Sequence, residues 1–354
     1  MRSSPDEAAL LRELVAIPSV SGAEAAVARC AAEAARSFGL RAEITANGVI
    51  VEAGRAGRPS MAFVSHLDTV PPGEGWTRDP FVAETEGGRL YGRGASDAKA
   101  SVAAMLTAAA DAEADGRLKG HLFVILGFCE ETRESTMAAA VAGCGPIDAA
   151  VVGEPTSLEF ATAQRGLMMV DLVAHGTQGH AAHAHGLGFK NALVELARDL
   201  VRLDGLFDDR QHPLLGRVVA TPTQAEAGVS RNVTPPTARA LLDVRSTPEW
   251  THAEIAERLR ASLTSEVIVA SDRLVPCQTP RDSRLLDAAR RARPVARCYG
   301  SPTCSDWVFL DGVDVVKCGP GDSRLSHAAN EWVTLAEVRA ARDFYTTVAL
   351  EYLW

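Results

Sequence analysis

The stretch that decides the fold is His121-Leu-Phe-Val-Ile-Leu-Gly-Phe-Cys129, which is followed directly by Glu130 and Glu131. A run this apolar is typical of a strand that is buried on both faces, as in a sheet covered by helices. The carboxyl ends of such strands carry the functional groups of open α/β proteins. Because neighbouring side chains on an extended strand point in opposite directions, we expect the two glutamates to have different tasks.

Two further apolar segments end in the same way. Residues 61–65 are followed by His66 and Asp68, and residues 148–153 are followed by Glu154. A carboxylate beside a histidine is the usual partner that orients a metal-bound imidazole, so we expect Asp68 to support His66. Since α/β sites gather where strands end, these side chains are predicted to lie together.

Loops supply two more candidates. Asp97 follows a glycine-rich turn and precedes a helix-like segment that starts at Ser101, and His327 lies in a turn-rich loop. Taken alone, Asp97 is as well explained as a helix N-cap, and Glu154 as a charge at a strand end. The whole set favours a site for zinc or a similar first-row divalent ion, because it offers imidazole and carboxylate donors without thiolates. The predicted ligands are His66, Asp97, Glu131, Glu154 and His327.

A series of different short motifs is spread along nearly the whole chain. They are Ser65-His66-Leu-Asp68-Thr-Val-Pro, Gly92-Arg-Gly-Ala-Ser-Asp97-Ala-Lys, Glu130-Glu131, Gly153-Glu154-Pro-Thr, Gly179-His180-Ala-Ala, Arg231-Asn232-Val-Thr-Pro, Ser305-Asp306, and Gly319-Pro-Gly with His327 and Glu331. On these motifs the chain resembles the M20 metallopeptidase family, co-catalytic zinc hydrolases that include acetylornithine deacetylase and succinyl-diaminopimelate desuccinylase.

The resemblance implies a role for each predicted site residue. His66, Asp97 and Glu154 would hold one zinc ion, and Asp97 would share the second with Glu131 and His327. Two Zn²⁺ per subunit are therefore expected, although Co²⁺ or Mn²⁺ suits the same donors. Glu130 would be the catalytic base, and Asp68 the partner behind His66.

Other implied roles fall in the middle of the chain. His180 would donate to the oxyanion, reaching the site of the partner subunit in a homodimer, while Asn232 and Arg245 would bind substrate. Arginine suits a carboxylate because its planar fork binds both oxygens. His183 and His185 are better explained as solvated loop residues, and Cys304 receives no role.

The order of the elements predicts an α/β fold with an insertion. Residues 1–162 and 277–354 are expected to form a catalytic zinc-hydrolase domain, a mixed sheet flanked by helices. Residues 163–276 have the order strand, helix, two strands, helix, strand, which is the ferredoxin-like α+β unit. The resemblance implies that this inserted domain acts as a lid and in dimerisation.

Composition excludes several classes of protein. The chain has 354 residues, enough for about two domains, with 47% hydrophobic residues and a formal charge of −9. It has no basic stretch for nucleic acid and no apolar run of membrane-spanning length. Seven cysteines without Cys-x-x-Cys pairs fit reduced thiols. With residues 1–6 lacking a signal-peptide core, a cytoplasmic location is expected.

The substrate is predicted from the C-terminal motifs. Residues 279–283, 300–303 and 319–327 look most similar to deacylases of acylated ornithine and lysine. We therefore expect hydrolysis of an N-acyl amino acid, N-acetylornithine or N-acetyl-lysine, to acetate and the free amino acid. The alternatives are release of lysine or ornithine from an acidic amino-group carrier protein, a dipeptidase, and a catalytically silent binding protein.

Overall fold

The computed structural model describes residues 5–132 and 135–354, which form two compact units. The first comprises the chain up to Thr162, Thr279–Tyr299 and Ser305–Trp354; the second comprises Ala163–Gln278 and Gly300–Cys304. Residues 1–4, on which the expected absence of a signal peptide partly depends, lie outside the described residues.

The second unit extends beyond the boundaries predicted from the sequence, 163–276. The segment Gly300–Cys304 also belongs to it, and the backbone N–H of Arg165 donates to the carbonyl of Ser301 in this segment (3.1 Å). Gly300 also packs so closely that a Cβ there would lie 2.6 Å from the carbonyl oxygen of Leu214. A segment placed by such long-range backbone contacts carries no local signal in the sequence.

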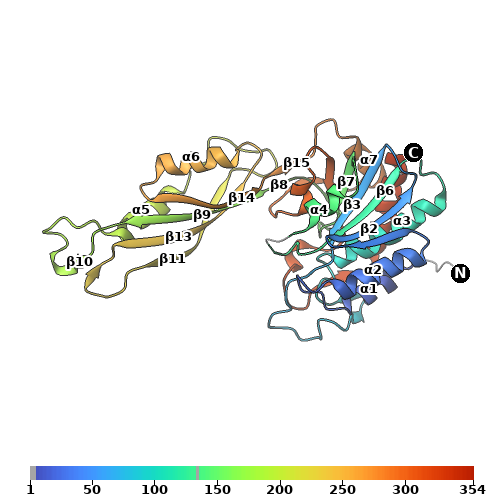
Figure 1. Cartoon of the computed structure of the whole chain (residues 1–354), viewed down its shortest axis with the longest axis horizontal. Helices are drawn as coiled ribbons and strands as arrows, with labels where there is room; N and C mark the ends of the chain where they lie inside the picture. Colours follow the sequence, from blue (N-terminus) through green and yellow to red (C-terminus); the bar gives the residue numbers. More distant parts are fainter. Residues whose placement is uncertain (1–4, 133–134) are drawn as a thin grey trace. The chain divides into compact units, whose positions relative to one another are not determined.

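A mixed nine-stranded sheet forms the centre of the first unit (Figure 1). Its strands β6, β3, β7 and β17 are parallel neighbours, and every residue of β3 and β6 is buried, as predicted for the apolar runs. The carboxyl ends of these strands therefore lie at one edge. The order is β1 (Arg41–Thr45), β2 (Gly48–Gly54), β6 (His121–Gly127), β3 (Ser60–His66), β7 (Ala149–Val152), β17 (Asp314–Lys317), β8 (Phe160–Gln164) and β15 (Cys277–Gln278), with β16 (Cys298–Ser301) paired to β8.

Helices pack against this sheet in one hydrophobic core. Helix α3 is buried on nearly all sides because its many alanines allow close approach by its neighbours. The predicted mixed α/β fold is thereby confirmed. The helices are α1 (Glu7–Val15), α2 (Ala25–Ser37), α3 (Lys99–Asp115), α4 (Met137–Ala142), α7 (Arg284–Ala292) and α8 (Leu335–Leu353), with short 3₁₀ turns η2 (Asp306–Phe309) and η3 (Ser323–Leu325) and a small sheet of β4 (Thr85–Glu86), β5 (Arg89–Tyr91) and β18 (Trp332–Thr334).

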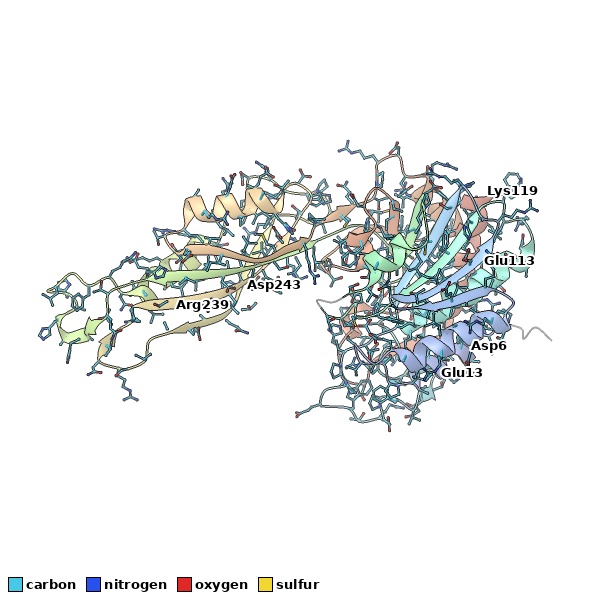
Figure 2. The ribbon with its side chains drawn as sticks, in the orientation of Figure 1. Asp6, Glu13, Glu113, Lys119, Arg239 and Asp243 are labelled. Carbon is cyan, nitrogen blue, oxygen red and sulfur yellow. The ribbon has the colours of Figure 1, made fainter. Side chains whose placement is uncertain are left out.

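The second unit has its own core and the predicted β-α-β-β-α-β order. Its antiparallel sheet has the strand order β11-β13-β9-β14. On β13, Arg239 pairs with Asp171 of β9 at 3.4 Å, and Figure 2 labels Arg239 and Asp243 on this strand. The elements are β9 (Gly166–His175), α5 (Ala192–Arg202), β11 (Val219–Ala227), β13 (Thr237–Ser246), α6 (His252–Ser262) and β14 (Glu266–Leu274), with a separate antiparallel pair of β10 (Gly179–His180) and β12 (Val233–Thr234) and the turn η1 (Ala181–His183).

Candidate metal centre

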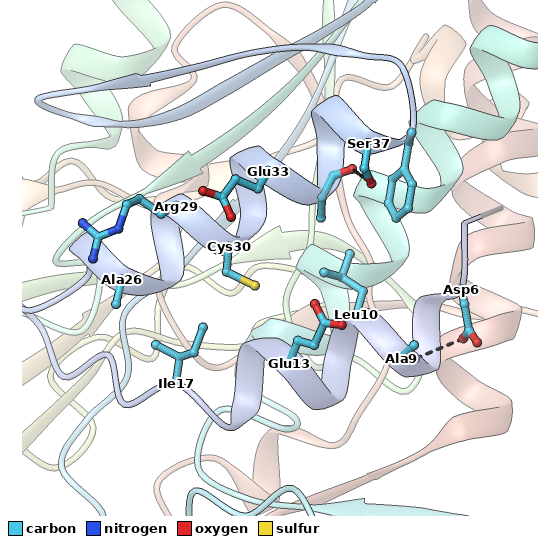
Figure 3. A pocket seen from close by; sticks show the side chains of 12 residues that line it. Asp6, Ala9, Leu10, Glu13, Ile17, Ala26, Arg29, Cys30, Glu33 and Ser37 are labelled. Atoms are coloured by element: carbon cyan, nitrogen blue, oxygen red, sulfur yellow. Dashed lines mark hydrogen bonds between the residues drawn. The ribbon is translucent and has the colours of Figure 1, made fainter. Parts of the chain in front are cut away.

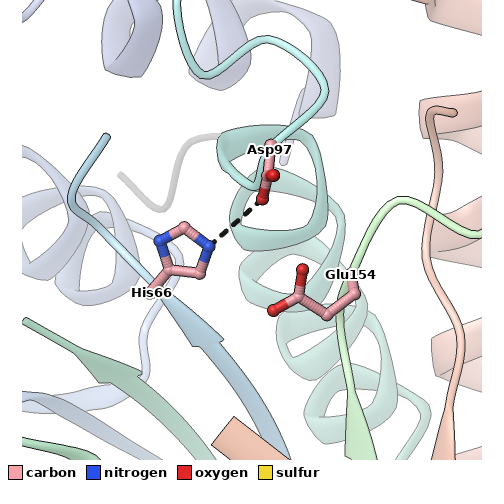
Figure 4. A group of neighbouring side chains, drawn as sticks. All are labelled: His66, Asp97 and Glu154. Atoms are coloured by element: carbon pink, nitrogen blue, oxygen red, sulfur yellow. Dashed lines mark hydrogen bonds and ion pairs between the residues drawn. The ribbon is translucent and has the colours of Figure 1, made fainter. Parts of the chain in front are cut away.

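One group of side chains lies where β3 and β7 end. His66 is the last residue of β3, and Glu154 follows β7 by two residues. Asp97 stands just before the start of α3, whose N-cap is Ala98, so its carboxylate is not used as a helix cap. Ligand atoms of His66, Asp97 and Glu154 all lie within 4.8 Å of one another (Figure 4).

A second group shares Asp97 with the first. The Nε2 atom of His327 lies 2.9 Å from one carboxylate oxygen of Glu131 and 3.9 Å from Oδ2 of Asp97. The other oxygen of Asp97, Oδ1, lies 3.3 Å from Nε2 of His66. Asp97 therefore presents one oxygen to each group, which is the arrangement of a carboxylate that bridges two cations.

Asp68 lies behind His66 and is fully buried. Nδ1 of His66 is 3.0 Å from the Asp68 carbonyl oxygen and 3.4 Å from its carboxylate. A proton on Nδ1 that is donated to Asp68 leaves the lone pair of Nε2 facing Asp97, as a metal ligand requires.

The two glutamates lie in a turn and not on an extended strand, so the alternation of side chains along a strand does not apply to them, and their different tasks stay a prediction. Strand β6 ends at Gly127, and Cys129 has a positive φ of 57° that turns the chain. The backbone N–H groups of Glu130 and Glu131 then donate to the two carboxylate oxygens of Asp68, each at 3.0 Å. Asp68 therefore fixes this turn as well as His66.

Negative charge is in excess around the two groups. Burial, reinforced by Asp97, raises the pKa of Glu154 to about 8 against the opposing charges of His66 and Lys317. Burial also raises the pKa of Glu130 well above its usual value and that of Asp306 to about 6. Crowded carboxylates with few cationic neighbours fit bound divalent cations, which would stabilise their ionised forms.

Two buried residues near these carboxylates were given no role from the sequence. Asp306 accepts a hydrogen bond from the Ser135 hydroxyl (2.8 Å) and is 3% exposed. Lys317 ends the apolar strand β17 and is 1% exposed. A lysine that closes an apolar run next to Gly-Pro-Gly was the available signal, since lysine is almost never buried without a charged or polar partner.

Three of the predicted site residues, His180, Asn232 and Arg245, belong to the second unit. His180 is exposed, and its Nδ1 accepts from the N–H of Ala182 (3.2 Å). Asn232 is its neighbour, because the carbonyl of Asn232 accepts from the N–H of Ala181 (2.9 Å) next to the pair of strands β10 and β12. The guanidinium of Arg245 donates to both carboxylate oxygens of Asp243, with N–O distances of 2.7 and 3.0 Å. Their roles in catalysis stay predictions.

A groove of about 610 Å³ lies elsewhere, between α1 and α2 (Figure 3). Cys30 lines it between Glu13 and Glu33, and burial with these two carboxylates raises the pKa of the thiol to about 11. A thiol that stays protonated at neutral pH is a poor nucleophile and ligand. The predicted site residues do not line this groove.

A mixed α/β fold with two adjoining groups of histidine and carboxylate ligands at its strand ends is typical of metal-dependent hydrolases. The model of peptidase family M20/M25/M40 matches residues 62–351. The chain belongs to this family, as its motifs indicated, and is a metal-dependent amidohydrolase.

Relatives and solved structures agree with this membership. The succinyl-diaminopimelate desuccinylase of Novosphingobium aromaticivorans is 30% identical over 98% of this chain and 99% of its own length, and that of Rhizorhabdus wittichii is 32% identical over 96% of each. An M20 family metallo-carboxypeptidase from Sulfolobus solfataricus superposes with a TM-score of 0.78 at 19% identity, over 98% of this chain and 99% of its own. A dinuclear metal-binding M20 peptidase from Bacillus subtilis gives 0.75 at 17% identity, over 98% and 97%. At these identities the two structures show the fold alone.

Within the described residues, no helix combines the length and the apolar character needed to cross a bilayer.

Proposed function

We propose that the chain is a dinuclear zinc hydrolase that cleaves the amide bond of an N-acyl amino acid. The observation that carries this proposal is the sharing of Asp97 between two ligand groups, while Glu130 belongs to neither group but interacts electrostatically with His66, Glu154 and Glu131. Two imidazoles and three carboxylates suit zinc, with cobalt and manganese as the expected substitutes. His66 and Glu154 would hold one ion and Glu131 and His327 the other, with Asp97 between the two.

Bound zinc ions would polarise the scissile carbonyl and lower the pKa of a water towards neutrality. Glu130 is the proposed base, because its carboxylate is close enough to His66 and Glu154 to feel their charges and belongs to neither ligand group. It would take the proton from the attacking water and pass it to the leaving nitrogen, which an amide needs because an amide anion is a very poor leaving group.

Asp68 supports this assignment by holding the backbone of Glu130 and Glu131 while it orients His66. The base and a ligand of each group are thus fixed by one carboxylate. In the second unit, His180 is proposed as the donor to the oxyanion, with Asn232 next to it beside the pair of strands β10 and β12. A donor of this kind is worth about a hundred- to a thousand-fold in rate in other hydrolases.

Among acyl groups, succinyl is the first candidate. The relatives over nearly the full chain are named succinyl-diaminopimelate desuccinylases, which favours that substrate over the N-acetylornithine expected from the C-terminal motifs. The succinyl group ends in a carboxylate, and Arg245 is the proposed partner for an anionic group of the substrate. Because Arg245 is paired with Asp243, the substrate would have to compete with Asp243 for the guanidinium of Arg245. N-acetylornithine and N-acetyl-lysine are the second candidates, on the loop motif 319–327.

We further propose a homodimer formed through the second unit. Helix α5 exposes Leu193, Val194 and Val201, the last with 76% of its surface exposed, and β11 is an edge strand. Exposed apolar side chains next to an unpaired strand edge are typical of an association surface. Light scattering after size exclusion tests this, and a monomer at micromolar concentration would refute it.

The first experiment measures amine release by metal-stripped and zinc-restored enzyme side by side. The panel contains N-succinyl-diaminopimelate, N-acetylornithine, N-acetyl-lysine and dipeptides. Zinc-dependent turnover that is highest on the succinyl substrate supports the proposal. A preference for an acetylated basic amino acid would select the second candidate. If the enzyme binds two zinc ions but is inactive on the whole panel, both substrate candidates, the succinyl and the acetyl amino acids, are refuted. Hydrolysis of a carrier-protein conjugate then remains.

A further inference from the structure

A buried glutamate behind the metal centre accepts hydrogen bonds from the loop that carries Asp97. Glu331 is fully buried. One carboxylate oxygen accepts the backbone N–H groups of Ser96 (2.8 Å) and Asp97 (2.9 Å), and the other accepts the N–H of Gly94 (3.1 Å). The backbone at Asp97 is therefore held directly by a charged group.

The second oxygen of Glu331 also accepts from the guanidinium of Arg93, at 2.6 Å. Arg93 is 1% exposed, and its other terminal nitrogen donates to the backbone carbonyls of Pro72 (2.9 Å) and His327 (3.3 Å). The pair thus connects the loop of Asp97 with the loop of His327, two ligands that are far apart in the sequence.

A buried ion pair is weak grounds for stability, because desolvation of both charges offsets their attraction. This pair is better explained by what it holds. Glu331 accepts four donors, two of them at or next to Asp97, and Arg93 reaches the carbonyl of His327. Groups of this kind, which orient metal ligands from behind, change metal affinity by about 10- to 100-fold when they are altered.

We propose that Glu331 and Arg93 are positioning residues that set the spacing of Asp97 and His327 and so make the second metal position. The inference rests on the proposed two-metal function. It predicts an asymmetry between variants. Glu331→Gln disturbs Asp97, which both groups use, and so weakens both metals. Arg93→Lys keeps the charge beside Glu331 but cannot also reach the His327 carbonyl, and so weakens only the group of Glu131 and His327.

The test measures metal binding without turnover. Full-length wild type, Arg93→Lys and Glu331→Gln are titrated with Co²⁺, and stoichiometry, chelator competition and the visible absorption spectrum are recorded. The control is Glu7→Gln, which removes a comparably buried carboxylate (4% exposed) from its pairs with Arg342 (2.7 Å) and Arg339 (3.3 Å) on α8. Glu7 has no contact with the ligands, so this variant should lose stability but keep the wild-type cobalt spectrum and affinities.

We expect Arg93→Lys to bind the first ion as the wild type does and the second about 10- to 100-fold more weakly. Unchanged affinities and spectrum in folded Arg93→Lys would overturn the inference, and this variant decides if Glu331→Gln does not fold. Wild type that binds two ions but hydrolyses no N-acyl amino acid would refute the proposed substrate while the variants still test the positioning role. If the wild type binds no ion, both the proposed two-metal function and the positioning role are overturned.

Discussion

Replacing Asp68 by Asn should separate the stability that this carboxylate supplies from its effect on the metal. Three groups donate to the carboxylate: the hydroxyl of Ser21 (2.7 Å) and the backbone N–H groups of Glu130 and Glu131 (3.0 Å each). Despite burial, hydrogen bonds and charge from His66 lower the pKa of Asp68 from 3.8 to about 2. Each pKa unit is worth about 1.4 kcal/mol, so the ionised carboxylate contributes about 2 to 3 kcal/mol to folding of the metal-free protein at pH 7.

An asparagine has one acceptor oxygen and turns its NH₂ towards donors, so the variant should lose about 2 to 3 kcal/mol of unfolding free energy. A lowered folded pKa contributes stability that is fully present above about pH 4 and is lost as the pH falls towards 2. The difference between wild type and Asp68→Asn should therefore be constant from pH 7 to 5 and shrink below pH 4.

Urea unfolding of the metal-free proteins at several pH values measures this difference, and metal titration follows the loss of support for His66. The matched control is Asp148→Asn, because Asp148 also holds a backbone N–H, that of Ser60 (2.8 Å), but at the opposite end of β3. It should lose stability without weakening the metal. Equal stability of Asp68→Asn and wild type at pH 7 would refute the argument.

Three other changes have defined outcomes. Glu130→Gln should lower kcat by about a hundred- to ten-thousand-fold with both metals retained, measured by turnover and metal analysis; a near-normal rate would exclude Glu130 as the base. Zinc at a hundred times its Kd should stabilise the fold by about 2.7 kcal/mol, visible as a rise in Tm that a chelator reverses; an unchanged Tm would contradict metal binding to the folded state. Gly319→Ala places a Cβ 2.6 Å from the carbonyl oxygen of Glu154, so metal affinity should fall, and wild-type affinity would show that the loop adapts without moving the ligand.

Apolar runs and element order were enough to predict most of the fold. The strands of residues 61–65 and 121–127 are buried throughout because most of their side chains are apolar and fit the inside of a sheet. The ferredoxin-like order of strands and helices was predicted from the hydrophobic periodicity and the length of each segment alone. Acids and histidines at strand ends then indicated that His66 and Glu154 would lie together, which the parallel neighbours β3 and β7 bring about, and the loop before α3 adds Asp97.

What the sequence left out depends on contacts between distant segments. The turn at Glu130 and Glu131 is formed by a left-handed residue, Cys129, and by the carboxylate of Asp68, and neither is visible in the apolar run before it. Arg93 and Glu331 form an ion pair although they are far apart in the sequence. From the sequence alone, a charged residue in a loop is expected to be exposed to solvent. The pairing of Arg245 with Asp243 was likewise hidden, although the two residues are close in sequence.

The position of β17 has a consequence for biosynthesis. This strand, Asp314–Lys317, lies between β7 and β8, which belong to the first half of the chain. A ribosome therefore releases most of the second unit before the sheet of the first unit can close, and until then β7 and β8 have unpaired backbone groups facing the gap. The nascent chain has to keep these edges from pairing with other proteins, and His327, the last ligand, emerges only after the gap is filled. The ligand group of Asp97, Glu131 and His327 is thus completed late in synthesis, whereas the residues of the group of His66, Asp97 and Glu154 are all made before β17.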